Sequence, residues 1–205
     1  MVQPGIGDLA ANRPGDAVRR KIIELEPNPL RRMLGRWLRG SEIHSWANGL
    51  VGEQVTGRRL RRLRHHGWFT LHAVQWASGV DIDHLAIGPA GVFTINSKRH
   101  RGSAVWYGDS AITVNRTPKR YIPISQHEAR RTSDVLSRKC GMIVNVRPVI
   151  SVVHAASLKV KGAAPPVLVL EVTELDRVLS GLTPVLSPDQ VARIYEVARD
   201  PTTWA

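Results

Sequence analysis

Side chains able to bind a divalent cation and a phosphate gather in one segment, "DIDHLAIGPAGVFTINSK" at residues 81–98. Asp81 and Asp83 precede a Gly-Pro-Ala-Gly turn, and Asn96 and Lys98 follow it. Alternating apolar residues on both sides of the turn predict a β-hairpin. If the turn is symmetric, Asp83 lies opposite Asn96 and Asp81 opposite Lys98, so the four side chains share one face. A solvent-facing ion pair between Asp81 and Lys98 would give the same pattern and would contribute little.

A third acid, Glu53, falls within a helix predicted over residues 43–66. It shares a stripe at helical spacing with apolar or small residues, namely Trp46, Leu50, Gly57 and Leu60. A lone carboxylate on a core-facing stripe is costly unless a metal ion or a cation partners it. Three glycines, Gly49, Gly52 and Gly57, would let this helix approach the sheet closely. We therefore expect Glu53 to point toward Asp83 and Asn96, the alternative being a stripe edge that reaches water.

The remaining elements predict an α/β domain with a mixed sheet. Short strands are expected at "WFTLHAV", "DIDHLAIG" and "GVFTINSK", and buried strands at "RPVISVVHA" and "PVLVLEV". Between these two groups, a hairpin is predicted at "SAVWYGDSAITVN", residues 103–115. A helix is predicted after Pro123, with Ser125 and Glu128 in capping-box spacing. Two closing helices follow, the second starting with a capping box at Ser187 and Gln190.

Three ordered runs, "WANGLVGEQVTGRRLRRL", "GWFTLHAV" and "DIDHLAIGPAGVFTINSKRHRG", give the chain a family resemblance. Together they resemble the nuclease-related domain (NERD) family over roughly residues 45–155. That family is similar to the PD-(D/E)XK nuclease superfamily. The resemblance implies a restriction-endonuclease-like core, a mixed β-sheet flanked by helices.

The resemblance also implies an active site. Glu53 and Asp83 correspond to acidic metal ligands, and the family's E-x-K pair falls on Asn96 and Lys98. The backbone carbonyl of Ser97 would be a further ligand, and Gln126 occupies the place of a supporting glutamine. The implied cofactor is Mg²⁺ or Mn²⁺, which prefers oxygen ligands, and lysine would steady the nucleophile or the phosphate charge. Asn96 departs from the pattern, because its oxygen can ligate a cation but brings no charge.

The charge favours a nucleic-acid partner, with DNA expected. The chain carries 29 Lys and Arg against 17 Asp and Glu, and only its last 40 residues are net acidic. Candidate phosphate contacts are Arg58, Arg62, Arg99 and Arg101, and Trp76 is the candidate for stacking on a base. The alternative is that these arginines form ordinary solvated faces and that Trp76 belongs to the core.

Residues 1–40 are expected to form a flexible N-terminus and a basic amphipathic helical extension to a domain at residues 41–205. The helix in "PNPLRRMLGRWLRG" would carry Leu30, Leu34, Trp37 and Leu38 on one side and arginines on the other. We expect it to pack on the main domain, although an anionic membrane or DNA would also suit it. Without an apolar run long enough for a membrane span or a signal peptide, and with Cys140 as the only cysteine, we expect a cytoplasmic location.

Three functions are compatible with the sequence. The first is a divalent-metal-dependent hydrolase of DNA phosphodiesters with Asn96 as a neutral ligand. The second is a catalytically inactive nucleic-acid-binding module of the same fold. The third is an adaptor on a membrane surface or another protein, which would use the N-terminal helix.

Overall fold

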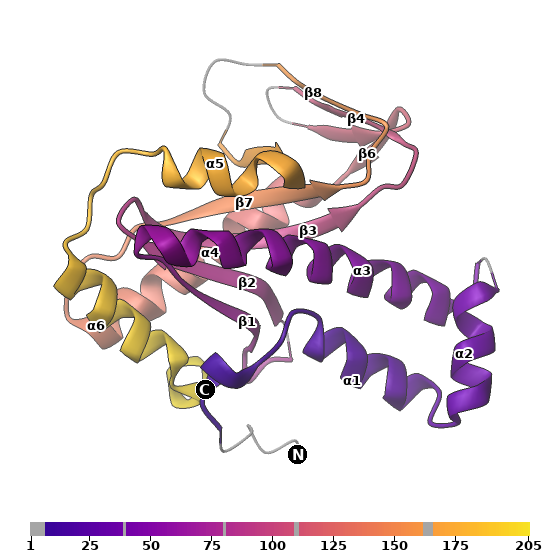
Figure 1. The fold of residues 1–205 in the computed structure, drawn as a ribbon, viewed down its shortest axis with the longest axis horizontal. Coiled ribbons are helices and arrows are strands. Elements are labelled where there is room, and N and C mark those ends of the chain that lie inside the picture. The colour runs from indigo at the N-terminus through magenta and orange to yellow at the C-terminus, as the bar shows by residue number, and fades with distance from the viewer. Residues whose placement is uncertain (1–6, 39, 80, 109–110, 162–165) are drawn as a thin grey trace.

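The computed structural model describes residues 7–205 except residues 39, 80, 109–110 and 162–165. The centre of this described part is a five-stranded sheet in the order β1-β2-β3-β7-β9 (Figure 1). Its strands are β1 (Phe69–Gln75), β2 (Asp81–Gly88), β3 (Gly91–Arg99), β7 (Val146–Val153) and β9 (Leu168–Glu171). The first three strands pair antiparallel, whereas β3, β7 and β9 run parallel, so the sheet is mixed.

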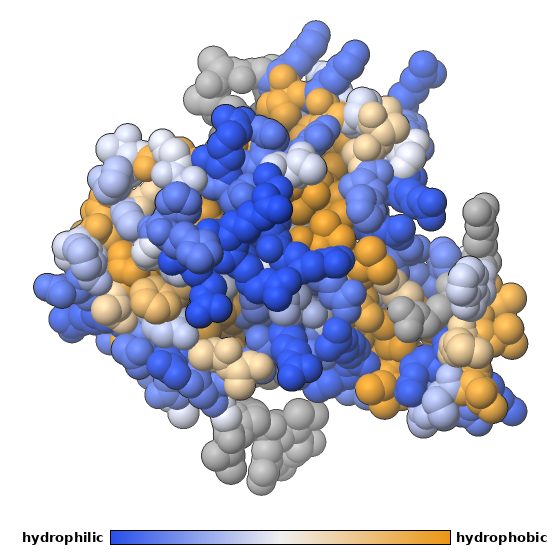
Figure 2. Space-filling model, viewed as in Figure 1, coloured by the Kyte–Doolittle hydropathy of each residue, from blue (hydrophilic) through white to orange (hydrophobic). Residues whose placement is uncertain are grey.

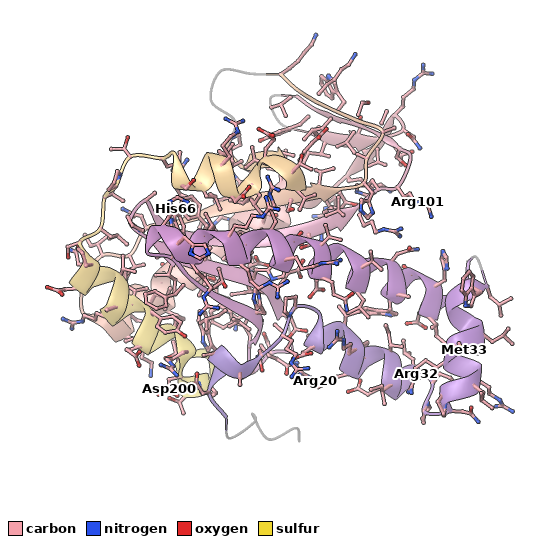
Figure 3. All side chains as sticks on the ribbon, viewed as in Figure 1. Arg20, Arg32, Met33, His66, Arg101 and Asp200 are labelled. Atoms are coloured by element: carbon pink, nitrogen blue, oxygen red, sulfur yellow. The ribbon has the colours of Figure 1, made fainter. Side chains whose placement is uncertain are left out.

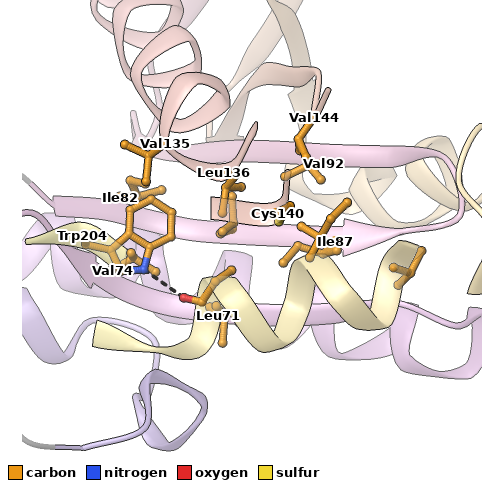
Figure 4. Close-up of a cluster of buried hydrophobic side chains, with 14 of the residues drawn as sticks. Leu71, Val74, Ile82, Ile87, Val92, Val135, Leu136, Cys140, Val144 and Trp204 are labelled. Carbon is orange, nitrogen blue, oxygen red and sulfur yellow. Dashed lines mark hydrogen bonds between the residues drawn. The ribbon is translucent and has the colours of Figure 1, made fainter. Parts of the chain in front are cut away.

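Helices cover both faces of this sheet, which confirms the predicted fold class. On one face lie α3 (Glu42–Leu60), the 3₁₀ helix η2 (Arg61–His66), η3 (Val172–Glu174) and α5 (Leu175–Ser180). On the other lie α4 (Tyr121–Cys140), α6 (Pro188–Arg199) and η4 (Pro201–Trp204). The second face holds a large apolar core, where Leu136 and Cys140 meet Val92 and Ile87 of the sheet (Figure 4). On the first face, Leu60 and Leu63 pack with Phe93 and Ile95.

A second, smaller sheet contains the hairpin predicted at residues 103–115. The sheet has the order β6-β5-β4-β8 and contains β4 (Ala104–Tyr107), β5 (Ile112–Val114), β6 (Thr117–Lys119) and β8 (Ser157–Val160). The strands β4 and β5 pair antiparallel as predicted. The strands β6 and β8 were not predicted, because three or four residues are too few for a clear alternating pattern in the sequence. The apolar side of this sheet joins Ile150 and Val152 of the main sheet in a third core cluster.

The β2–β3 hairpin has the predicted register. Every pair in the ladder, from Gly88 opposite Gly91 to His84 opposite Ile95, is centred on the Pro89–Ala90 turn. The ladder ends there, however, and the predicted pairs of Asp83 with Asn96 and Asp81 with Lys98 do not form. Asp81 pairs instead with Gln75 of β1.

An irregularity in β1 explains why the hairpin opens. The β1–β2 ladder skips the pair Ala73–Asp83, and Ala73 has a φ of 49°. On one side of the skipped pair His84 lies beside Gly57 of α3, and on the other side Val74 and Ile82 join the core against α4 and α6. The strands thus change face at Asp83 without losing register. A positive φ at alanine is uncommon, and the alternating sequence pattern gives no sign of it.

The helix α4 begins earlier than predicted, at Tyr121 rather than after Pro123, with Arg120 as the residue before it. Ser125 and Glu128 therefore lie inside the helix, and both are buried. The expected capping box at these residues is wrong, whereas the one at Ser187 and Gln190 forms as predicted.

The N-terminal extension contains η1 (Leu9–Ala11), α1 (Asp16–Leu25) and α2 (Pro29–Trp37). Val18 and Ile22 of α1 pack against Leu50 of α3. The residues before α1 are held too, because Asp8 pairs with Arg199 and the Asn12 side chain donates to the carbonyl of Ala73 at 3.2 Å. The expectation of a flexible N-terminus is wrong for residues 7–15, while residues 1–6 lie outside the described part. The domain boundary near residue 41 stays a prediction.

Candidate active site

Asp83 occupies the fork where β2 and β3 separate. Its Oδ2 accepts a hydrogen bond from the backbone N–H of Ser97 at 2.7 Å. The last pair of the β2–β3 ladder is His84 with Ile95, and Asp83 is the next residue of β2. Its carboxylate thus accepts from β3 a backbone hydrogen bond of the kind that a strand carbonyl accepts in a ladder. Burial raises the pKa of Asp83, and the nearby Lys98 and the Ser97 amide act against that rise.

Glu53 reaches this fork from α3. Glu53 is only 6% exposed, as its place on the apolar stripe predicts. Burial raises the pKa of Glu53 to about 9, and repulsion from Asp83 and Asp81 adds to the rise, partly offset by Lys98. Among the glycines, Gly52 allows the close approach of α3 to β3, since a Cβ there would lie 3.4 Å from that of Arg99. Gly49 plays no such part, because nothing lies within 4 Å of the position of its Cβ.

The backbone N–H of Gly15 acts against the rise in the pKa of Glu53. This effect comes from the N-terminal extension, where Gly15 precedes α1 with a φ of 84°. Next to it, Pro14 packs against α3 at Gly57 so closely that a Cβ on Gly57 would lie 2.3 Å from Pro14 Cγ. The sequence gives no sign that residues 14 and 15 reach the candidate site.

Asn96 and Lys98 join the site from β3. The Lys98 ammonium donates to Asn96 Oδ1, and Asn96 Nδ2 in turn donates to Glu128 Oε2 of α4 at 3.2 Å. Lys98 also lies 5.4 Å from the centre of the Tyr121 ring. The neutral residue at position 96 is therefore hydrogen-bonded to an acid on the neighbouring helix.

Glu128 is the site residue that the sequence analysis missed. Burial raises its pKa to about 8, with a further rise from Asp83 and opposing effects from Lys98 and the Asn96 amide. Its capping-box spacing to Ser125 suggested a local role at a helix start. Its four-residue spacing to Thr132 and Leu136, both fully buried, was the signal that it faces the sheet.

Gln126 does not take the supporting place suggested for it. It is half-buried, and within the described residues no hydrogen bond links its side chain to the site. The helix geometry explains this, because residues 126 and 128 are separated by about 160° around the axis. With Glu128 facing the sheet, Gln126 turns away from it.

Asp81 is near the site but not paired with Lys98, and in the described part of the chain no ion pair joins them. Its Oδ1 is buried without a hydrogen-bond partner. Burial raises the pKa of Asp81 to about 6, Arg20 of α1 lowers it, and Asp83 raises it. An orphaned carboxylate oxygen beside other carboxylates is a place where a cation would be favourable.

The donor types fit a hard divalent cation. Mg²⁺ is commonly held by one or two carboxylates with water and substrate phosphates, and Asp83 and Glu53 supply two carboxylates. Within the described residues, no group of three or more His, Cys, Asp or Glu side chains is close enough together to hold an ion. A site here would therefore rest on two acids at a time, completed by neutral oxygens and ligands from outside the chain.

Two buried histidines support the backbone at Ser97. His84 Nε2 lies 3.2 Å from Ser97 Oγ, and His72 Nδ1 lies 2.9 Å from His84 Nδ1. Burial lowers the pKa of His84 well below its usual value and that of His72 to about 4, so both are neutral at pH 7. The pair thus holds β3 in place with uncharged hydrogen bonds.

Arg99 and Arg101 lie at the end of β3 that carries Lys98. They line an open pocket of about 470 Å³ together with His44, Asn48, His100 and Ser103. Arg99 donates to Asn48 and to His154, while Arg101 is exposed at the surface (Figure 3). The pocket is polar and basic and adjoins the candidate site along the strand.

Arg58 and Arg62 are not brought to that pocket. Arg58 lies at the other end of α3, about 15 Å along the helix from Asn48, and Arg62 follows in η2. Arg58 is exposed and bonds to the carbonyl of Gln54, and Arg62 pairs with Asp176 at 3.7 Å.

Trp76 is buried at 4% exposure, and its ring lies between Trp204 and the guanidinium of Arg131. The suggestion that it stacks on a base is therefore wrong. The residue follows the face change at Ala73, which turns it into the core.

Comparison with known proteins gives one match. No curated protein and no solved structure matches the chain. The family model described as "Nuclease-related domain" matches residues 48–154, the segment that contains α3 from Asn48 onward, the fork, α4 and β7. Because this match spans more than half of the 205 residues, the chain belongs to the nuclease-related domain family.

Proposed function

We propose that this protein is a divalent-metal-dependent hydrolase of DNA phosphodiesters. The observation that carries the proposal is that two buried acids, Glu53 and Glu128, each interact with Asp83 and with one lysine at the β2–β3 fork. Glu53 comes from α3, Asp83 from β2 and Glu128 from α4, and Lys98 is the cation among them. Buried carboxylates are costly when they serve structure alone, and such groupings concentrate at functional sites.

Mg²⁺ or Mn²⁺ would be held by Asp83 and Glu53, with the Asn96 amide oxygen and the Ser97 carbonyl as neutral donors. Such an ion supplies Lewis acidity toward a phosphoryl oxygen and neutralises charge on the phosphate. Glu128 lies within hydrogen-bond distance of Asn96. A bound cation would favour its ionised form over the protonated one, and the carboxylate would then contribute the negative charge that position 96 lacks.

The side chains of the protein position the reaction. Lys98 can donate to a phosphate oxygen or to the attacking water, because its ammonium has three N–H groups and gives one of them to Asn96. Asp83 orients the Ser97 backbone through its N–H, and the His84 contact holds the Ser97 hydroxyl. Hydrolysis forms a bond from water oxygen to phosphorus and breaks the ester P–O bond, with one proton lost by water and one gained by the leaving oxygen.

DNA would approach along the end of β3. The basic pocket beside Asn48 and Arg101 adjoins Lys98 and would hold a backbone phosphate next to the scissile one. The net charge of +12 favours a polyanion, and Arg58 and Arg62 would add contacts if the duplex runs along α3.

A second candidate is a nucleic-acid-binding module without catalysis. One observation favours it, because Asn96 is neutral and both ends of its amide are already engaged, by Lys98 and by Glu128. With both ends of the Asn96 amide bonded to protein side chains, the site resembles a buried polar network that serves structure and not catalysis.

A plasmid-nicking assay separates the two candidates. With Mg²⁺ or Mn²⁺ the parent should convert supercoiled plasmid to the nicked form, and EDTA should stop the reaction. Asp83→Asn, Lys98→Ala and Glu128→Gln should each lower the rate by about 100-fold or more, the range of one lost electrostatic contact in a catalytic site. Asp134→Asn, which removes an exposed carboxylate from the same helix as Glu128, is the matched control and should keep the parent rate. Duplex binding without metal-dependent nicking would select the module.

A further inference from the structure

The helix α2 is turned with its apolar side away from the protein. The face toward α3 is formed by Gly35, which is buried against Ile43 so closely that a Cβ on Gly35 would lie 2.8 Å from Ile43 Cδ1. The large apolar residues of the helix and its end point outward, with exposures of 55–81%: Leu30, Met33, Leu34, Trp37 and Leu38. The helix therefore contacts the main domain through its small residue, and its apolar stripe stays exposed.

These apolar residues form one surface at the edge of the molecule. Figure 2 shows hydrophobic residues gathered over the end where α2 lies in Figure 1. Ile23 and Leu25 of the preceding helix are 51% and 36% exposed and extend the surface toward α1. Singly exposed apolar residues are normal on soluble proteins, but a cluster this concentrated marks an interaction site.

The charge beside this surface is positive. Residues 29–38 contain three arginines and no acidic residue, and residues 16–38 together hold six Lys or Arg against three Asp or Glu. A pocket of about 320 Å³ opens between α1, α2 and α3, lined by Arg19 and Arg32 and by the apolar side chains of Ile22, Ile23 and Leu50. Figure 3 shows Arg32 and Met33 at this corner of the molecule. A cation beside an apolar wall suits an amphiphile that carries a phosphate.

We propose that α2 docks the protein on an anionic phospholipid bilayer, with Leu30, Leu34 and Trp37 in the interface and Arg19 and Arg32 facing lipid phosphates. A helix with aromatic and leucine residues on one face and arginines beside them is the type that lies in the plane of a bilayer surface. None of the helices in the described part is long and apolar enough to cross a bilayer, so α2 would lie on it. Charge complementarity selects the lipid over a second copy of this chain, which would bring the same positive charges together.

Flotation with lipid vesicles tests this. Vesicles of phosphatidylcholine alone are compared with vesicles containing phosphatidylglycerol, and the probe is the full chain. Trp37→Ser removes an 81% exposed apolar side chain without changing charge, and Ile143→Ser removes another with the same exposure in the segment that follows α4. We expect binding to the anionic vesicles only, lowered about tenfold or more by Trp37→Ser and unchanged by Ile143→Ser. Both positions are exposed, so both variants should fold.

Several results would overturn the proposal. Equal binding by the parent and Trp37→Ser would mean that the basic charge alone attracts the vesicles. No flotation with anionic vesicles at low salt would exclude lipid. If Trp37→Ser converts a dimer to a monomer in size-exclusion chromatography while vesicle binding is absent, the occupant is a second copy. If the same change weakens duplex DNA binding instead, α2 is a DNA contact.

Discussion

At the scale of single residues, position 96 decides how this site differs from its family pattern. The strand places an amide where the resemblance implies an acid, and α4 places Glu128 within 3.2 Å of that amide. A carboxylate on a helix can thus stand beside a strand residue that lacks one. The pattern of residues along one strand cannot report this, because the partner is 32 positions away in the chain.

Asn96→Glu should strengthen metal binding. In EDTA the variant should have a lower melting temperature than the parent. Its free energy of unfolding should be lower by about 1–3 kcal/mol, because Glu128 loses its hydrogen-bond donor and gains a negatively charged neighbour. With Mn²⁺ its melting temperature should rise more than that of the parent, since an ion bound only by the folded state stabilises it. Gln126→Glu adds the same charge to the face of α4 that turns away and should show the metal-induced shift of the parent. Equal shifts in all three proteins would show that position 96 is not a ligand.

The raised pKa values of Glu53 and Glu128 predict how stability depends on pH. Each carboxyl group keeps its proton to a higher pH in the folded protein than in the unfolded chain. The free energy of unfolding therefore falls as pH rises from the ordinary carboxyl pKa to the pKa in the folded protein. That pKa is about 8 for Glu128 and about 9 for Glu53. The buried histidines act in the opposite direction, but only below their ordinary pKa of about 6.5.

Melting in EDTA at pH 6.8 and at pH 8.5 therefore isolates the acids. The parent should melt at a lower temperature at pH 8.5, and Glu128→Gln should reduce that difference because it cannot ionise. Asp134→Asn should leave the difference unchanged. A parent whose melting temperature is the same at both pH values would contradict the buried environment of these acids.

At the scale of elements, α3 and the hairpin could be predicted and their surroundings could not. The apolar stripe of α3 placed Glu53 correctly, and the turn symmetry gave the correct register, because both depend on local periodicity. The opening of the fork depends on the positive φ of Ala73, and the start of α4 depends on tertiary contacts of residues before Pro123. Neither leaves a periodic signal.

Two glycines on α3 test how the N-terminal extension sits on that helix. Gly57→Ala should lower the unfolding free energy by about 1–3 kcal/mol, because the new Cβ would lie 2.3 Å from Pro14 Cγ and the contact would have to open. Gly49→Ala, on the same helix with nothing within 4 Å of its Cβ, should raise it by up to about 1 kcal/mol through helix propensity. Urea unfolding measures both. Stabilisation by both changes would show that Pro14 does not pack there.

At the scale of the whole molecule, the chain combines three surfaces around one mixed sheet. The fork holds acids, the end of β3 holds a basic pocket, and α2 presents an apolar face. Composition predicted the positive charge, and the order of the expected helices and strands predicted the α/β class. Neither could predict that α2 would bury Gly35 rather than its leucines, because which face of an amphipathic helix meets the protein is set by the shape of its neighbour.

The last prediction concerns the path of DNA over this surface. Affinity for a duplex should fall with rising salt, with log affinity losing roughly 0.9 per unit of log salt for each phosphate contacted. Arg101→Ala should reduce that slope by roughly 0.9, because Arg101 is exposed beside the pocket that adjoins Lys98. Arg58 lies about 15 Å along α3 from Asn48, which is the length of four or five phosphates on one DNA strand. If the duplex runs parallel to α3, adding Arg58→Ala to Arg101→Ala should reduce the slope by a similar further amount. Arg193→Ala, on the exposed side of α6, removes the same charge far from this path and should leave the slope unchanged. If Arg101→Ala and Arg193→Ala change the slope equally, binding follows net charge alone, and the duplex has no defined path past the fork.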